Sequence, residues 1–200
     1  MTGRLVLGSL LVCLTGCLLP KTRAPIVVQQ RSASWPAPGV QRVLVRPFVY
    51  SGPDSETARR GVEKLLLGLE QTGRFQLIRS DHIVAAPAGN TFPPRTPAGV
   101  APHLILTGDV LVSRPYPPQS FGLAFRFEDV MKGEIVFEAS GVFDASNAET
   151  RDDLEAWTDD HVGNDSEGSA LNESLLSVDR FQQYVTSRWM RELIATPVAR

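Results

Sequence analysis

The sequence is poor in cysteine, and both of its cysteines lie near the amino terminus. Only Cys13 and Cys17 occur among the 200 residues. The chain beyond residue 17 therefore contains no thiol, which excludes disulfide bonds and cysteine-ligated metal sites from that part. A folded region there must be stabilised by a hydrophobic core rather than by covalent cross-links.

A basic surface is also missing. The chain has 20 Lys and Arg against 22 Asp and Glu, a net charge of −2, and its basic residues form no stripe. Proteins that bind nucleic acid need such a stripe or patch to contact the phosphates. We therefore expect no nucleic-acid partner.

The apolar run near the amino terminus is too short to cross a membrane. It extends from Leu5 to Leu14, whereas a spanning helix needs about 20 apolar residues. One positive charge, Arg4, precedes the run and small residues follow it, as in a secretory signal. The alternative is a signal-anchor helix that happens to contain cysteines.

The end of this run, Leu14-Thr15-Gly16-Cys17, resembles the lipobox of bacterial lipoproteins. The resemblance implies that residues 1–16 are a signal peptide and that Cys17 carries acyl chains such as palmitate. Several acyl chains on one residue anchor a protein stably, because each buried methylene contributes ~0.8 kcal/mol. Leu18, rather than an aspartate, follows the cysteine. By the same resemblance this favours the outer membrane, with the protein facing the periplasm.

Beyond the lipidated cysteine, the composition predicts a linker and then one domain. Residues 17–40 are rich in Pro, Ser and Gln, which is typical of a flexible tether. We expect order to begin at Gln41, a single α/β domain to occupy residues 41–196, and residues 197–200 to form a tail.

Alternating and continuous apolar runs predict the strands of this domain. They cover Arg42 to Val49, Arg74 to Ser80 and His103 to Ser113, followed by a hairpin whose turn contains Gly133. The run from His103 to Ser113 predicts a central strand that is buried on both faces. Residues 85–102, with five prolines and two glycines, are expected to form a loop.

Helical spacing predicts two further elements. The first is capped by Asp54 or Ser55, ends at Gly73, and lies between two strands that we expect to be parallel. The second follows Ser177 and has one buried stripe, which consists of Phe181, Val185, Trp189 and Leu193. The expected fold is an α/β (α+β) sandwich with a mixed sheet of about five strands and two or three helices.

Catalytic and cofactor motifs are not found. The patterns GxxxxGK, GxGxxG, GxSxG and HExxH do not occur, and the three histidines lie far apart in the sequence. We therefore predict no catalytic residue and no cofactor. His103 begins an apolar run and is expected to be structural.

An acidic segment, Asp144 to Glu167, offers the remaining candidate for chemistry. Its carboxylates could gather around a hard cation such as calcium, although the spacing does not fit an EF-hand loop. We favour a solvated acidic loop, in which case no metal is bound. The candidate ligands are Asp159, Asp160, His161, Asp165 and Glu167.

Four segments together resemble a known type of envelope domain. They are RVLVRPF from Arg42, LEQTGRFQLIRSD from Leu69, HLILTGDVLV from His103 and MKGEIVFE from Met131. Their order is similar to that in the curli secretion-channel lipoprotein, in lipoprotein activators of penicillin-binding proteins and in the amino-terminal domain of the Tol periplasmic protein. This resemblance covers Arg42 to Phe143 and implies a protein-binding domain without catalysis.

Three functions follow as hypotheses. The first is a lipid-anchored, non-catalytic envelope domain that binds another envelope protein, as part of an assembly or secretion machine. The second is an oligomeric channel or scaffold component, and the third is an envelope hydrolase that uses carboxylates of the acidic segment.

Overall fold

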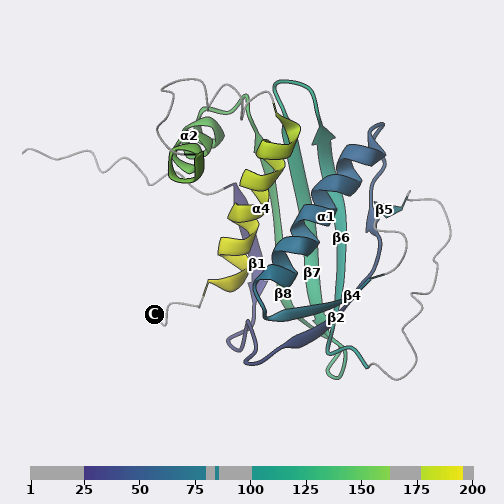
Figure 1. Cartoon of the computed structure of the whole chain (residues 1–200). Helices are drawn as coiled ribbons and strands as arrows, with labels where there is room; N and C mark the ends of the chain where they lie inside the picture. Colours follow the sequence, from purple (N-terminus) through teal and green to yellow (C-terminus); the bar gives the residue numbers. More distant parts are fainter. Residues whose placement is uncertain (1–24, 80–83, 86–100, 163–176, 196–200) are drawn as a thin grey trace, which may run out of the picture.

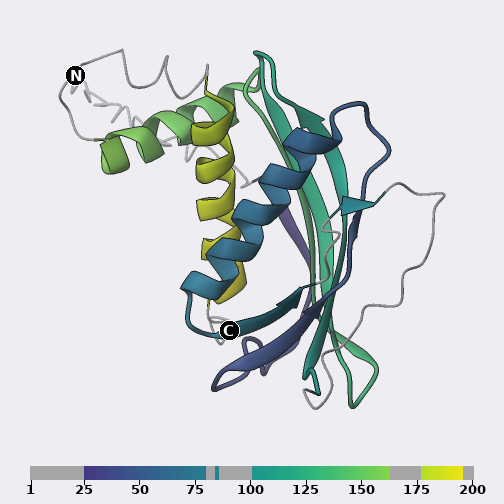
Figure 2. The same cartoon turned by 45° about the vertical axis from the view of Figure 1, so that its right-hand side comes forward.

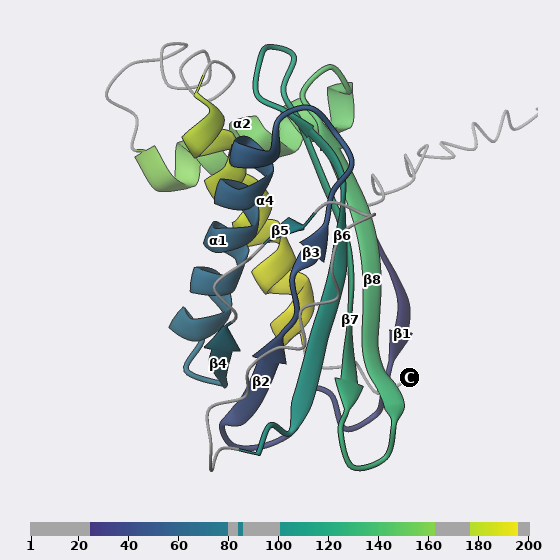
Figure 3. The ribbon, with the colours of Figure 1, turned by 90° about the vertical axis from the view of Figure 1, so that its right-hand side faces the viewer.

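The fold consists of one mixed β-sheet with helices packed against one of its faces (Figures 1 and 3). The computed structural model describes residues 25–79, 84–85, 101–162 and 177–195. The main strand order is β1-β8-β7-β6-β2-β4, with β3 beside β6 and β5 beside β3. The elements are β1 Ile26–Arg31, β2 Gln41–Val45, β3 Phe48–Val49, α1 Ser55–Gln71, β4 Phe75–Arg79, β5 Val84–Ala85, β6 Leu104–Arg114, β7 Ser120–Asp129, β8 Glu134–Asp144, α2 Ala148–Val162 and α4 Val178–Ile194.

The predicted α/β sandwich with a mixed sheet is therefore confirmed, although the sheet has eight strands rather than about five. The unit formed by β2, α1 and β4 agrees with its prediction, since β2 and β4 are parallel. The Asp54 carboxylate accepts the N–H of Thr57 at 3.0 Å and caps α1. Gly73 follows the helix with φ of 67°, a conformation that glycine adopts without steric cost.

The antiparallel hairpin of β7 and β8 also agrees with its prediction, and Gly133 in its turn has φ of 65°. The expectation that the run from His103 is buried on both faces is wrong. Leu106 and Val110 of β6 are buried toward the helices, whereas Leu111 is 50% exposed. The physical reason is that α1 and α4 cover only one face of the sheet (Figure 2).

Aromatic side chains fill the space between this face and the helices. The predicted stripe of α4 is buried along its whole length, and the Trp189 ring lies 4.8 Å from that of Phe125. In α1, a side chain at Gly61 would overlap the ring of Phe121. Glycine at this position thus allows the helix to approach the sheet closely.

The folded region begins earlier than the sequence predicts, because part of the expected tether is a strand. Residues Ile26–Arg31 form β1, which pairs antiparallel with β8 at the edge of the sheet. Trp35 is only 3% exposed, and its ring lies 4.8 Å from Phe127 and 5.2 Å from Phe137. Its indole N–H donates to the carbonyl of Leu193 at 3.0 Å. The expectation that order begins at Gln41 is therefore wrong. The reason is that β1 pairs with residues more than a hundred positions later, and such pairing leaves little local signal in the sequence.

We predict that Trp35→Ala lowers the free energy of unfolding by about 3–5 kcal/mol, because it empties a buried aromatic site and removes a hydrogen bond. Urea unfolding of the purified protein measures this change. Val40→Ala is the control, since Val40 is 57% exposed in the same segment and should change stability by less than about 0.5 kcal/mol. Equal small effects of both substitutions would show that this segment does not belong to the core.

Asp144, at the end of β8, fixes the connection to α2. Its carboxylate accepts the Ser146 hydroxyl at 2.6 Å, the Ser146 N–H at 2.8 Å and the Ser120 hydroxyl at 3.0 Å. The bond from the Ser146 hydroxyl is the largest of several effects that lower the pKa of Asp144, against the opposing effect of partial burial. The folded state therefore favours the ionised carboxylate.

We predict that Asp144→Asn lowers the free energy of unfolding at pH 7 by about 1 kcal/mol. Because the pKa of Asp144 is lower in the folded than in the unfolded chain, its contribution is present above the unfolded pKa of about 3.9. This stabilising contribution is lost as the pH falls through the pKa of Asp144 in the folded chain. The free energies of unfolding of variant and wild type therefore become more similar below about pH 4. Urea unfolding at pH 7 and below about pH 4 tests this prediction, and the exposed Asp152→Asn is the control. A difference that stays constant with pH would contradict the assignment.

Candidate functional site

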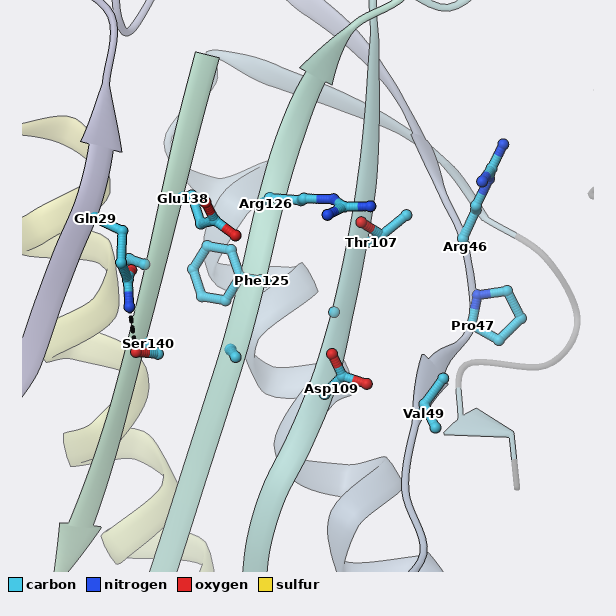
Figure 4. A pocket seen from close by; sticks show the side chains of 13 residues that line it. Gln29, Arg46, Pro47, Val49, Thr107, Asp109, Phe125, Arg126, Glu138 and Ser140 are labelled. Carbon is cyan, nitrogen blue, oxygen red and sulfur yellow. Dashed lines mark hydrogen bonds between the residues drawn. The ribbon is translucent and has the colours of Figure 1, made fainter. Parts of the chain in front are cut away.

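The face of the sheet opposite the helices carries a shallow hollow of about 370 Å³. Figure 4 shows this open face, with α1 and α4 behind the sheet. Side chains from β1, β3, β6, β7 and β8 and from the turn between β2 and β3 border the hollow. They include Gln29, Arg46, Pro47, Val49, Thr107, Asp109, Arg126, Glu138 and Ser140.

Strand alternation explains why these polar residues share one face. On β7, Phe125 and Phe127 point toward the helices, so Arg126 between them points away. The register places Arg126 between Thr107 of β6 and Glu138 of β8, which gives a polar row across three strands with charges on two of them. The same register places Ala124 between Asp109 and Ser140. Ala124 carries only a methyl group, so this second row is lower and forms the floor of the hollow.

The charges of the open face have no partners in the part of the chain that the structure describes. Within those residues, Arg126, Asp109 and Glu138 take part in no side-chain hydrogen bond or ion pair, although Arg126 and Glu138 are direct cross-strand neighbours. Opposite charges in this position contribute only about 0.2–1 kcal/mol to a sheet. These groups are therefore available to a molecule that binds the face.

Exposed apolar side chains surround the charged rows. Val27 pairs with Ser140, Val142 pairs with Gly122, and Val49 pairs with Asp109, so all three valines lie on the open face. Each is more than a third exposed. The open face therefore presents exposed apolar side chains beside its charged groups.

The described residues place two hydroxyl groups at the hollow. Ser140 is its only hydroxyl beside Thr107, and the Ser140 hydroxyl accepts a hydrogen bond from the Gln29 amide. In the described ranges no histidine borders the hollow, and its titratable side chains are the carboxylates of Asp109 and Glu138 and the guanidinium groups of Arg46 and Arg126.

The acidic segment is a helix over much of its length rather than the loop that the sequence favours. Leu154 and Trp157 of α2 are buried, and this anchors the helix although its acidic face is solvated. Asp159 and Asp160 are exposed in its last turns. The ring of His161 stacks on Trp157 at 4.7 Å, which gives the histidine a packing contact.

The remaining two candidate ligands, Asp165 and Glu167, lie outside the described residues. Among those that are described, no three His, Cys, Asp or Glu side chains are placed to hold a metal ion. One side chain of α4, Tyr184, makes a structural contact with α2. The Tyr184 hydroxyl donates to Asp153 at 2.8 Å, and burial, with this carboxylate, raises the pKa of Tyr184 far above its usual value.

Two further predictions concern single residues, His103 and Cys17. His103 lies directly before β6, where its Nδ1 accepts the N–H of Arg42 at 3.3 Å, so it has a structural role as predicted. Cys17 lies outside the described residues, so its lipidation stays a prediction. In the described ranges no helix combines the length and the apolar character that membrane crossing requires.

Sequence reasoning did not identify the open face. A signal was present, because Thr107 and Asp109 interrupt the apolar run of β6 at alternate positions. Such alternation indicates a strand with one solvated face. Without knowledge of the strand order, however, the polar residues of β6, β7 and β8 could not be assigned to one surface.

Comparisons with known proteins give only distant similarity. No protein-family model matches the sequence, and no curated protein matches it either. Three solved structures are similar to this chain in part. A PelC dodecamer from Paraburkholderia phytofirmans is 11% identical, with 80% of this chain and 96% of that chain covered and a TM-score of 0.37.

The second structure, lipoprotein GNA1162 from Neisseria meningitidis, is 12% identical, with 62% of this chain and 98% of that chain covered and a TM-score of 0.37. The third, a Xanthomonas campestris protein of the DUF330 family, is 8% identical, with 80% and 89% covered and a TM-score of 0.39. Similarity at this level carries no argument about function, and the specific group that the sequence resembles is not confirmed by it.

Proposed function

We propose that this chain is a lipid-anchored protein of the bacterial envelope whose non-catalytic domain binds another protein through the open face of its sheet. The observation that supports this most directly is a set of charged side chains on that face without partners among the described residues, beside exposed valines. The lipobox-like Leu14-Thr15-Gly16-Cys17 supports the anchor.

The shape of the face favours a protein over a small molecule. Sites for small molecules are concave and bury 70–90% of the ligand surface. The hollow here is shallow, and its lining residues are spread from Gln29 on β1 to Val49 on β3, across five strands of the sheet. A broad, weakly curved surface of this kind suits a partner that contacts several strands at once.

The charges define the chemistry of the partner. Arg46 and Arg126 require carboxylates opposite them, whereas Asp109 and Glu138 require cations. Because both signs occur, a uniformly acidic or basic partner would place like charges against the face, and such juxtapositions cost several kcal/mol. We therefore infer a partner surface that also carries both signs.

A second copy of this chain is the second candidate, and it corresponds to the oligomeric scaffold. Arg126 and Asp109 lie on neighbouring strands and neither is paired in the described part of the chain. In a twofold arrangement with the open faces opposed, Arg126 of each copy could meet Asp109 of the other. Such reciprocal pairing is the property of an isologous interface.

The open-face prediction is tested with a photo-crosslinking residue at Thr107 in intact cells. We expect an adduct with one protein, and we expect Arg126→Glu to reduce its yield about tenfold, which corresponds to ~1.4 kcal/mol. Arg74→Glu is the matched control, because it makes the same charge change at an exposed residue outside the hollow.

The mass of the adduct separates the two candidates. An adduct with twice the mass of the processed chain identifies a second copy, and any other mass identifies a different protein. If the yield is the same in Arg126→Glu as in the wild type, or if no adduct forms at the open face, the proposal is wrong.

The anchoring prediction is tested by cell fractionation. We expect Cys17→Ser to move the protein from the membrane fraction to a soluble or unprocessed form, because the acyl chains have no attachment point. Cys13→Ser is the control and should leave the distribution unchanged, since the resemblance assigns Cys13 to the removed signal. Equal behaviour of the two variants would contradict lipidation at Cys17.

A further inference from the structure

This inference rests on the proposed anchor at Cys17 and concerns the end of the domain that lies nearest to it. Ile26, the first residue of β1, follows Cys17 by nine positions. A fully extended chain spans ~3.3–3.6 Å per residue, so the anchor can lie at most about 30 Å from Ile26. Because the folded region begins at β1 rather than at Gln41, the domain lies closer to the proposed anchor.

The direction of β1 determines which end of the domain is near the anchor. Ile26 pairs with Gly141, close to the end of β8. At the same end lie the loop between β6 and β7 and the start of α1, and the three views agree on this (Figures 1, 2 and 3). The hairpin turn of β7 and β8, which contains Met131, lies at the opposite end.

The loop between β6 and β7 has an unusual composition for an exposed turn. It reads Pro115-Tyr116-Pro117-Pro118, and Tyr116 is 77% exposed. Leu111, 50% exposed, lies below it on the wall of a groove of about 770 Å³, which residues 50–54 border on the other side. The Tyr50 hydroxyl donates to the carbonyl of Ser113 at 3.3 Å and holds the two walls together.

The physical chemistry of this loop suits the boundary between lipid headgroups and acyl chains. A tyrosine has an apolar ring and a polar hydroxyl, and it is enriched at that boundary for this reason. Proline has no N–H group, so within residues 115–118 only Tyr116 has a backbone donor that would lose water on contact. Few backbone N–H donors must therefore lose water when this loop contacts a membrane surface.

We propose that the loop of residues 115–118, together with Leu111, docks onto the surface of the membrane that holds the lipid anchor. The ring of Tyr116 then lies at the level of the headgroups, with the strands pointing away from the bilayer. Because the open face runs along the strands, it stays accessible to a protein partner. The acidic residues of α2 lie at the same end of the domain (Figure 1), so a zwitterionic surface is the suitable probe.

The absence of other thiols permits a direct test. Once Cys17 is lipidated, a cysteine introduced elsewhere is the only free thiol and can carry an environment-sensitive dye. The lipidated protein is reconstituted in phosphatidylcholine vesicles that contain spin-labelled lipid, with the dye at Tyr116→Cys. The matched control is Met131→Cys, at a side chain 90% exposed at the opposite end of the sheet.

We expect the dye at residue 116 to be quenched about twofold or more relative to the dye at residue 131, as for a group at the interface. In a second experiment the dye is placed at Leu111→Cys, and adding Tyr116→Ser should lower its quenching toward the value at residue 131. A tyrosine without a role in docking would leave that quenching unchanged.

Two failures are distinguishable by flotation of the vesicles. If the protein floats with the vesicles and the two dyes are quenched equally, docking is wrong and the anchor stands. If the protein does not float, the lipid anchor is wrong, and the docking proposal that rests on it is overturned as well.

Discussion

The burial of aromatic side chains between the helices and one face of the sheet is the interaction on which the rest of the structure depends. Trp35, Phe127 and Phe137 pack together beside β1, and Trp189 of α4 closes the layer over Phe125. With no thiol beyond Cys17, this layer takes the place that disulfide bonds hold in many exported domains. It also assigns alternate residues of every central strand to the opposite face, so the polarity of the open face is a consequence of the core.

Local pattern was sufficient for the elements whose signals lie within a few residues. The cap at Asp54, the turn at Gly133 and the buried stripe of α4 agree with their predictions, because capping, positive φ and helical spacing are properties of short segments. The strand β1 and the burial of Trp35 could not be predicted in this way. Their energy comes from pairing and packing with β8 and α4, which lie more than a hundred residues later in the chain.

The candidate site likewise combines features with a local sequence signal and features that depend on distant parts of the chain. The polar residues of β6 were visible in the sequence, but an apolar run with two polar interruptions fits a strand buried on both faces as well as one buried on a single face. Only the placement of both long helices on one side decides between them. Arg126 and Glu138 then become neighbours through the register of β7 and β8, which depends on the hairpin turn rather than on either residue.

The strand β1 connects the proposed anchor, the core and the open face. Ile26 is buried toward the helices, and Gln29 contributes to the hollow through its bond to Ser140. Arg31 donates to the carbonyl of Ala195 at 3.0 Å and so joins β1 to the end of α4. The strand pair of β1 and β8 therefore joins the proposed anchor to the proposed binding face, since β1 follows Cys17 in the sequence and both strands border the hollow.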